Sequence, residues 1–466
     1  MLASFIFFFI RKSVGVFGLL SLAASLVELG SALYVASGGK VSSFTSYFSV
    51  DALGMILMLI VATIGLMVSW YSISYLNEEK RKEIIGFRRI KQYFILLHLF
   101  LAAMFIAIIS ANPIVMWIAI EATTLSTAFL ISFYNKPSAI EAAWKYLIIN
   151  SVGLLLAFLG TLLFLYPVLG HAGLVNWQTL LGNAASLDPF VAKIAFIFIL
   201  IGYGTKVGLV PMHTWLPDAH SKAPVPISSL LSGVLLNVAF FAVLRFKAVV
   251  DLAIGPYFTG RLLIFFGIIS IALAAFIIFG QRNYKRLLAY SSIEHMGLMS
   301  LGFGFGGAGA FGALLHMIYH SLTKSLLFLS SGNIFLRYSS TKIEKVRGVL
   351  TALPATGIIF FIGFLSITGV PPFGIFLSEF YILSGGIMSH PFLTGLALLA
   401  LAIVFIGFLK HVTSMLFGKP EEGIEIGKEA SGRLAPLLVI VILLAILGFY
   451  IPGPLKSLIN SAISIY

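Results

Sequence analysis

Apolar runs of about twenty residues recur along almost the whole chain, and a run of that length can cross a bilayer as an α-helix. We expect membrane spans at about residues 50–76, 91–110, 114–134, 143–168, 190–216, 225–247, 260–279, 288–305, 308–337, 351–386, 392–418 and 433–453. The first 36 residues hold two shorter apolar runs around Arg11 and Lys12. A signal peptide carries its charges before the apolar run, so we interpret this segment as two short or tilted membrane helices. The pattern predicts an all-α polytopic membrane protein with about 14 transmembrane helices.

Connections rich in charge alternate with uncharged connections along the chain, and this alternation assigns each connection to one side of the membrane. One side receives Arg11 and Lys12 and the connections at residues 77–91, 135–144, 218–224, 281–286, 337–347 and 418–433. The other side receives connections such as 111–113 and 306–308, which carry no charge. Because basic loops stay cytoplasmic, we expect a multi-pass protein of the cell (plasma) membrane with both termini outside. Four residues depart from this pattern: Lys193, Arg245, Lys247 and Arg261.

Composition agrees with a protein that acts in the membrane. The chain is 59% hydrophobic and 10% charged, whereas a soluble domain carries roughly a quarter charged residues. Cysteine is absent, which excludes disulfides, thiolate zinc sites, cysteine-ligated iron–sulfur clusters and a cysteine nucleophile. The net charge of +13 comes mostly from short loops between apolar runs, so we expect the lipid bilayer as its partner and no nucleic acid.

Two spans are interrupted by proline and glycine. The first interruption covers residues 204–217 around Pro211, and the second covers residues 367–374 around Pro371 and Pro372. Proline removes a backbone hydrogen bond and clashes with the preceding turn, so each helix should break there. The freed backbone groups must face protein or water rather than lipid.

Broken helices at matching places in two halves are typical of inverted-repeat transporters. Residues 91–247 would form the first five-helix repeat and residues 260–418 the second, with the broken helix fourth in each. Each repeat crosses the membrane five times, which is an odd number, so the second repeat starts from the opposite side of the membrane, as inversion requires. Residues 1–90 then supply N-terminal transmembrane helices, and residues 433–466 supply a C-terminal transmembrane helix.

Ionisable residues inside the spans are costly and each needs a reason. Glu121 is either a structural acid bonded to Thr123 and Thr124 or an acid that exchanges protons. Lys206 precedes the first break, where exposed carbonyls favour an ammonium, and it either exchanges a proton or ties down the break. Glu379 follows the second break and is either a cap of the new half-helix or a relay group.

A row of basic side chains marks the span at residues 308–337. His316, His320 and Lys324 have i, i+4, i+8 spacing, which places them on one helix face with about 6 Å of rise between neighbours. Histidine exchanges protons near neutral pH, so the row is a candidate proton route. A His-x3-His pair can also bind zinc, but the sequence offers no third ligand of suitable spacing, and we expect no metal site.

Weaker candidates lie in the neighbouring spans. They are Glu294, with His295 beside it, and Lys145 and Lys410 near span ends. Long lysine side chains near span ends reach the membrane surface easily, which is the alternative interpretation for Lys145 and Lys410.

Several of these residues stand in motifs. The run Lys206-x4-Pro211-x-His213-x-Trp215 and its continuation to His220 resemble the signature of antiporter-like membrane subunits. Such subunits are shared by respiratory complex I, Mrp-type sodium/proton antiporters and energy-converting nickel–iron hydrogenases. Runs 285–292 and 316–324 are similar to the second-half motifs of this family, and the resemblance covers residues from about 50 to 418. Runs 121–125, 144–146 and 202–206 are most similar to the hydrogenase and formate hydrogenlyase branch.

This resemblance implies roles for the candidate residues. Glu121 and Lys206 would form the first-half couple, the stripe 316–324 would connect the halves, and Glu379 would occupy the second-half exit. His213 would be a secondary member. Many family members have a lysine where this chain has Asn237, so the relay must pass that point by water or by another side chain.

The function that we expect is translocation of H⁺, Na⁺ or both by a membrane subunit of a redox-driven complex. That complex would be an energy-converting hydrogenase or formate hydrogenlyase, with a Mrp-type antiporter or a complex I-type dehydrogenase as alternatives. The chain itself would hold no cofactor, and nickel–iron and iron–sulfur centres would lie in partner subunits of a peripheral redox arm. The alternative of another class is a structural membrane scaffold that moves no ions.

Overall fold

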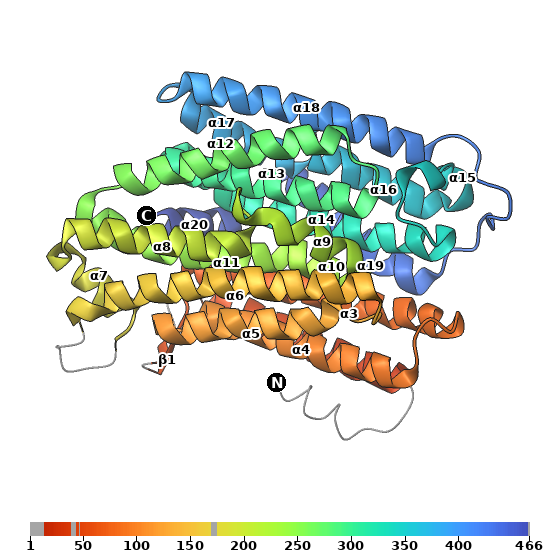
Figure 1. Ribbon diagram of the computed structural model, residues 1–466, viewed down its shortest axis with the longest axis horizontal. Coiled ribbons are helices and arrows are strands. Elements are labelled where there is room, and N and C mark those ends of the chain that lie inside the picture. Colours follow the sequence, from red (N-terminus) through yellow and green to blue (C-terminus); the bar gives the residue numbers. More distant parts are fainter. Residues whose placement is uncertain (1–13, 39–42, 46, 169–174, 465–466) are drawn as a thin grey trace.

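The computed structural model describes residues 14–38, 43–45, 47–168 and 175–464, so the helix expected at residues 1–10 lies outside the described part. Nearly all of the described chain is helical, and the long helices run side by side in one bundle (Figure 1). Strands β1 (Ser43–Thr45) and β2 (Phe48–Ser49) form a small antiparallel ladder. The predicted all-α class is confirmed.

The long helices follow the predicted spans. The N-terminal helices are α2 (Val14–Ser37) and α3 (Ala52–Arg81). The first set, which corresponds to the five spans expected at residues 91–247, begins with α4 (Phe87–Ile109), α5 (Pro113–Ile131) and α6 (Pro137–Leu165). It continues with the broken pair α8 (Pro189–Val207) and α9 (Trp215–Lys222) and ends with one long helix made of α10 (Val225–Leu230), η4 (Leu231–Leu235) and α11 (Leu236–Ile254). The second set contains α12 (Tyr257–Phe279), α13 (Tyr284–Phe305), α14 (Gly307–Tyr338), the broken pair α16 (Pro354–Ile367) and α17 (Gly374–Ile387), and α18 (Pro391–Leu416).

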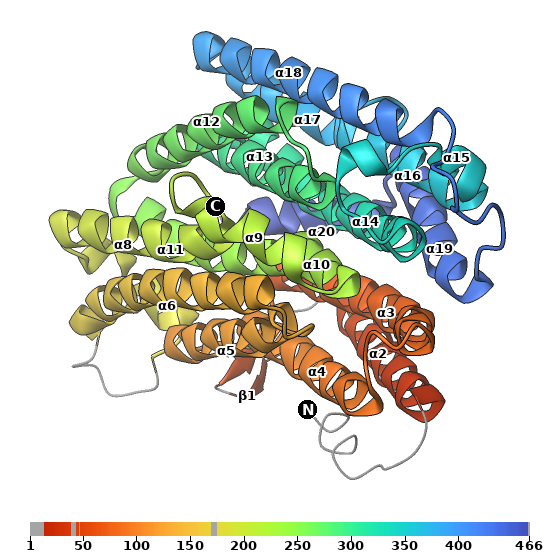
Figure 2. The ribbon, with the colours of Figure 1, turned by 45° about the vertical axis from the view of Figure 1, so that its right-hand side comes forward.

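Shorter elements connect these helices. They are η1 (Tyr166–Val168), α7 (Trp177–Gly182), η2 (Ala184–Ser186), η3 (Met212–Thr214), η5 (Ile343–Lys345) and α15 (Val349–Ala352). At the C-terminus the structure differs from the expected single helix, because α19 (Ser431–Phe449) is followed by α20 (Gly453–Ile463). The prolines at 452 and 454 end the span, and α20 packs back against α3 and α14 (Figure 2).

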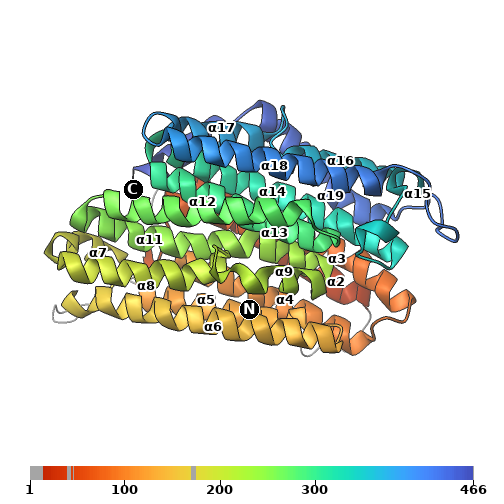
Figure 3. The same ribbon diagram turned by 45° about the horizontal axis from the view of Figure 1, so that its top comes forward.

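Among the described residues, ten helices are long and apolar enough to cross a membrane. The shorter apolar helices α16 and α17 together replace the span expected at residues 351–386. Helices α13 and α14 are not among the ten, although they are long and lie inside the bundle (Figure 3). These two helices carry many of the buried ionisable residues, which lower their apolar character.

Both predicted helix breaks are present, each in fourth place in its set. The first helix of the first pair ends at Gly208, which has φ +85°, a backbone conformation that glycine adopts without a Cβ clash. In the second pair, Gly369 lies in the gap between α16 and α17 and has φ +65°, which is also a conformation that favours glycine. Pro211 and Pro372 lie in the two gaps, where no helical hydrogen bond is lost.

Contacts between connections show which of them share an end of the bundle. Lys82, after α3, donates to the carbonyl oxygen of Leu336 at the end of α14. Asp218 in α9 accepts from Arg286 at the start of α13. The α3–α4 and α18–α19 connections lie together on the right of Figures 1 and 2. The basic connections therefore gather at one end, as the charge pattern predicted.

Two of the basic residues that depart from the charge pattern are compensated at the opposite end. Arg245 in α11 pairs with Asp51, the residue that caps α3. Lys247 pairs with Asp251, one turn later in the same helix. Both side chains are buried, so each ion pair removes the cost of an isolated charge.

Glycines allow the closest helix contacts. A Cβ on Gly202 in α8 would lie 2.5 Å from the backbone nitrogen of Ala157 in α6. A Cβ on Gly267 in α12 would lie 2.7 Å from the carbonyl oxygen of Gly297 in α13. Small residues at such crossings let backbones approach in a membrane, where packing replaces the hydrophobic effect as the driving force.

We therefore predict that Gly202→Ala lowers the apparent melting temperature of the detergent-solubilised protein, because overpacking costs about 1–3 kcal/mol. Gly395→Ala is the matched control, since a Cβ there meets no atom within 4 Å and alanine favours the helix. Equal melting temperatures for the two variants would contradict the close-contact account.

Candidate ion-translocation site

Lys206 occupies the end of the first half-helix and turns into the bundle. It is the penultimate residue of α8, and Gly208 ends the helix after it. Its Nζ donates to Thr124 Oγ1, to Tyr146 OH at 3.3 Å and to the carbonyl oxygen of Ile120 at 3.4 Å. The side chain is fully buried, so its hydrogen bonds must replace water.

Glu121 lies beside this lysine without a direct ion pair. Its Oε1 accepts from Ser151 Oγ at 2.9 Å, and its Oε2 lies 3.4 Å from Thr124 Oγ1. The Thr124 hydroxyl, which accepts from Lys206, therefore bridges the two charges. Thr123 donates instead to the carbonyl oxygen of Ile120, so it plays no part in holding the acid. The structure brings together the couple expected from the sequence.

Aromatic residues enclose the lysine. Tyr146 OH lies 2.6 Å from Thr127 Oγ1, and its ring meets Trp215 edge-on with centroids 5.0 Å apart. Trp215 Nε1 donates to the carbonyl oxygen of Thr205, 2.8 Å away across the break. The tryptophan of the sequence motif thus fixes the two half-helices against each other beside Lys206.

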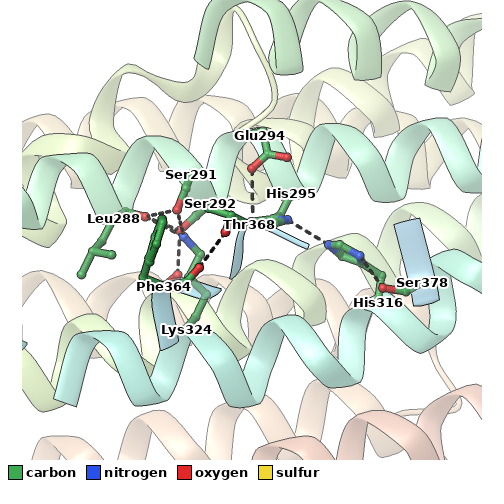
Figure 4. A network of polar contacts seen from close by, with 11 residues as sticks. Leu288, Ser291, Ser292, Glu294, His295, His316, Lys324, Phe364, Thr368 and Ser378 are labelled. Atoms are coloured by element: carbon green, nitrogen blue, oxygen red, sulfur yellow. Dashed lines mark hydrogen bonds and ion pairs between the residues drawn. The ribbon is translucent and has the colours of Figure 1, made fainter. Parts of the chain in front are cut away.

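Lys324, in α14 of the second set, is also fully buried (Figure 4). Its Nζ donates to the carbonyl oxygen of Leu288 at 2.7 Å and to Ser291 Oγ, both in α13. Ser292, next along α13, exchanges a hydrogen bond of 2.7 Å with Ser232 in η4. Lys324 is therefore joined through α13 to the last helix of the first set.

Three histidine rings gather one to two turns from Lys324. His295 Nδ1 lies 3.0 Å from His316 Nε2, and His316 Nδ1 lies 2.9 Å from Ser378 Oγ in α17 (Figure 4). The ring of His320 lies 5.3 Å from that of His295 and 6.2 Å from that of His316. His316 and His320 share one face of α14, as the spacing predicted, and His295 from α13 completes the cluster.

Two carboxylates lie at the far side of this cluster. Glu294 Oε2 is 3.3 Å from His295 Nε2. Glu379 lies in the second turn of α17 against the second break, where a Cβ on Gly369 would come within 2.1 Å of its Oε2. The N-cap of α17 is Phe373, so the alternative role of Glu379 as a helix cap is not fulfilled.

Asn237 links the two sets at the centre of the bundle. Its Nδ2 donates to Ser321 Oγ at 2.9 Å and to the carbonyl oxygen of Met317 at 3.4 Å, both in α14. The residue is fully buried in α11, two residues after the end of the π-helical η4. This amide bridges the sets but holds no exchangeable charge.

Two histidines of the first motif lie between the buried lysines. His213 is in the break, with its ring 6.4 Å from that of Tyr290 in α13. His220 in α9 is fully buried and stacks on Phe328 of α14, and neither of its ring nitrogens has a hydrogen-bond partner.

Lys145 and Lys410 are placed elsewhere. Lys145 is exposed at the start of α6, where it pairs with Glu141 at 2.6 Å and Asp218 at 3.6 Å. Lys410 is exposed on α18, with its Nζ 4.8 Å from the centroid of the Phe279 ring. Neither contacts the buried row, in agreement with the surface interpretation.

Sequence reasoning named Thr124 as a partner of Glu121, but it missed that Thr124 also binds Lys206 and that Tyr146 and Ser291 bind the buried lysines. Thr124, Tyr146 and Ser291 are ordinary helix residues by pattern, and their role depends on helices that meet only in the fold. His220 was named only as the end of the motif that begins at Lys206, and no role was expected for it.

Comparisons with known proteins match this arrangement. A family profile described as "NADH:quinone oxidoreductase/Mrp antiporter, TM" matches residues 110–406. A second, described as "NADH-Ubiquinone oxidoreductase (complex I), chain 5 N-terminus", matches residues 39–83. The first match covers more than half of the chain and includes both helix breaks.

Individual relatives carry names from the same group. The chain is 40% identical to a hydrogenase-4 component F homolog of Methylacidiphilum infernorum, over 80% of each protein. It is 30% identical to hydrogenase-4 component B of Escherichia coli, over 71% of this chain and 49% of that protein. NADH-quinone oxidoreductase subunit M of Rickettsia felis is 29% identical over 71% of this chain and 66% of its own length.

Solved structures share the fold. A chain of the membrane-bound sulfane sulfur reductase, an archaeal respiratory membrane complex, has a TM-score of 0.88 and 23% identity, with coverage of 100% of this chain and 95% of that chain. A chain of the Mrp complex from a Dietzia species has a TM-score of 0.80 and 18% identity, with coverage of 100% and 97%. A chain of respiratory complex I from Thermus thermophilus has a TM-score of 0.78 and 22% identity, with coverage of 96% of this chain and 95% of that chain.

The buried lysines, the paired helix breaks and these matches lead to one assignment: the chain belongs to the NADH:quinone oxidoreductase/Mrp antiporter family, as a multi-pass antiporter-like membrane subunit of the complex I, hydrogenase-4 and Mrp type.

Proposed function

We propose that this chain moves protons, Na⁺ or both across the membrane, driven by electron transfer in partner subunits. The observation that carries the proposal is the row of ionisable residues that runs from half-buried Glu121 through fully buried Lys206 and Lys324 to half-buried Glu379. A membrane protein whose only task was to hold partners would need no such row, because each buried charge destabilises the fold unless it is compensated.

The first-half couple is arranged to change its protonation state. A charged Glu121 favours the ammonium form of Lys206 through the Thr124 bridge. When that contact loosens, burial favours the neutral amine, and Lys206 releases its proton. The bridge is a single hydroxyl, so a small movement of α5 against α8 suffices to alter the coupling.

Passage between the sets needs a group other than Asn237. His220 is suited to this role because it is buried against Phe328 of α14, the helix that carries Lys324, and neither of its ring nitrogens has a hydrogen-bond partner. His213, in the break, stands between Lys206 and α13. Water bridging these side chains would complete the route, since polar buried groups without a partner attract it.

In the second set, the path would continue from Lys324 through the histidine cluster to Glu379. The inverted arrangement of residues 91–247 and 260–418 is part of the proposal, and it gives each repeat one broken helix and a lysine with no exposed surface, Lys206 in the first and Lys324 in the second. Glu379 lies next to the second break and is only half-buried, which suits an exit position.

The partners that we propose are other membrane subunits and a peripheral redox arm, with nickel–iron and iron–sulfur centres in those subunits. The names of two relatives, hydrogenase-4 components F and B, favour a hydrogenase or formate hydrogenlyase assembly. The likeness to a Mrp complex and to complex I supports the alternatives of an antiporter or a dehydrogenase. In the plasma membrane, the basic end of the bundle would lie on the cytoplasmic side, and both termini would lie outside.

We predict that Glu121→Gln lowers ion movement roughly tenfold or more, because it deletes the charge that controls Lys206 while keeping size and hydrogen bonding. The measurement is the pH gradient formed by the complex in proteoliposomes, next to its redox rate. Glu121→Asp is the matched control, since it retains the charge on a shorter stem and should keep part of the gradient. A Glu121→Gln variant that pumps as well as the parent would assign the acid a structural role.

A second prediction concerns the histidine cluster. His320→Ala should slow ion movement, because it removes a ring that faces both His295 and His316. His411→Ala is the control: this buried histidine lies on α18, where its Nε2 is 3.1 Å from the carbonyl oxygen of Ile278. Equal gradients for the two variants would remove the cluster from the path.

A further inference from the structure

Glu294, His295 and Glu379 converge on one point. On an α-helix, adjacent side chains normally diverge, yet the ends of Glu294 and His295 in α13 meet at 3.3 Å. Glu379 arrives from α17, and one ligand atom from each of the three residues lies within 4.8 Å of the other two. No other group of at least three histidine or acidic residues in the described part of the chain meets this criterion.

The converging atoms lack hydrogen-bond donors. Apart from the 3.3 Å contact between Glu294 Oε2 and His295 Nε2, the two carboxylate oxygens of Glu294 and this nitrogen have no hydrogen-bond partner, and each side chain is 1% exposed. Buried polar atoms are almost always hydrogen-bonded, because an unpaired one costs the free energy of its lost hydration. Three such atoms around one point indicate a position for a ligand that accepts electron pairs.

The donor set selects the kind of ligand. Na⁺, Mg²⁺ and Ca²⁺ prefer sites made of oxygen atoms, whereas an imidazole nitrogen with carboxylate oxygens suits Zn²⁺ and related transition metals. Two carboxylates and one divalent ion also sum to zero charge when the imidazole is neutral. A neutral cluster is the least costly one in a membrane interior.

The surroundings fix the orientation of the donors. His295 uses Nδ1 toward His316 at 3.0 Å, and His316 in turn meets Ser378 at 2.9 Å, which leaves His295 Nε2 on the side of Glu294 (Figure 4). A hydrogen bond to the ring nitrogen that does not bind the metal sets the tautomer of a ligating histidine. Metal–ligand bonds of roughly 2.0–2.1 Å require the ligand atoms of the three residues to approach one another by about 1 Å, which a glutamate side chain achieves by rotation.

We propose that Glu294, His295 and Glu379 form a binding site for a divalent transition-metal ion, with Zn²⁺ as its best-suited occupant. The bound ion would hold Glu379 and His295 in fixed positions and displace any proton that they carry. Resting on the proposed function, we further infer that Zn²⁺ blocks ion movement through the second set.

The test of binding uses the full chain in lipid nanodiscs, stripped with a chelator and dialysed against Zn²⁺ alone. We expect one zinc ion per chain, and at least about tenfold weaker binding in Glu294→Gln and in Glu379→Gln, as each removes a charged ligand. Glu121→Gln and His220→Gln are the matched controls and should bind as the parent does. X-ray absorption should report nitrogen and oxygen ligands at roughly 2.0–2.1 Å.

Three results would overturn the site: no bound zinc in the parent, parent-like binding in both acid variants, or loss of zinc with His320→Gln alone. In the complex in proteoliposomes, Zn²⁺ should inhibit the parent at concentrations that fill the site. Zinc binding at these residues without inhibition would keep the site and refute the block. Zinc binding in a complex that moves no ions would keep the site and refute the proposed function.

Discussion

Each charge buried in the middle of this bundle must be compensated from within the protein, because lipid offers no hydrogen bonds. Lys206 and Lys324 meet this requirement in the same way, with a neighbouring helix carbonyl and a hydroxyl. Neither lysine is locked in a direct ion pair with an acid within 4 Å. A lysine held by neutral groups retains the freedom to give up its proton, whereas a tight ion pair would fix it as an ammonium.

The helix breaks position two of the ionisable residues. An intact helix uses its own carbonyls, but a broken one leaves end groups free to interact with side chains. The first break places Lys206 at such an end, and the second places the Glu379 carboxylate against Gly369. Glycine packing between α6 and α8 then brings Tyr146 within reach of Lys206, and Thr124 reaches it from α5. Local sequence, helix packing and the polar row thus depend on one another.

Much of this could be predicted from the sequence, and the remainder follows a physical rule. The spans, both breaks and the stripe of His316 and His320 are periodic or proline-marked features, so they can be found along the chain. The partners of Lys206 come from α5 and α6, and the meeting of Glu294 with Glu379 requires α13 and α17 to pack. A pattern within one helix carries no information about such meetings. The turn into α20 was also missed, because its proline pair lies inside an otherwise apolar tail.

The most direct test of the account is the number of ions moved per electron by the assembled complex with Lys206→Met. Methionine keeps an apolar stem of similar reach but removes the exchangeable proton, so assembly should be retained and ion movement lost. Lys410→Met, an exposed lysine on α18, is the control and should leave the ratio unchanged. An unchanged ratio in an assembled Lys206→Met complex would contradict the account, because the buried lysine would then serve only to hold the break.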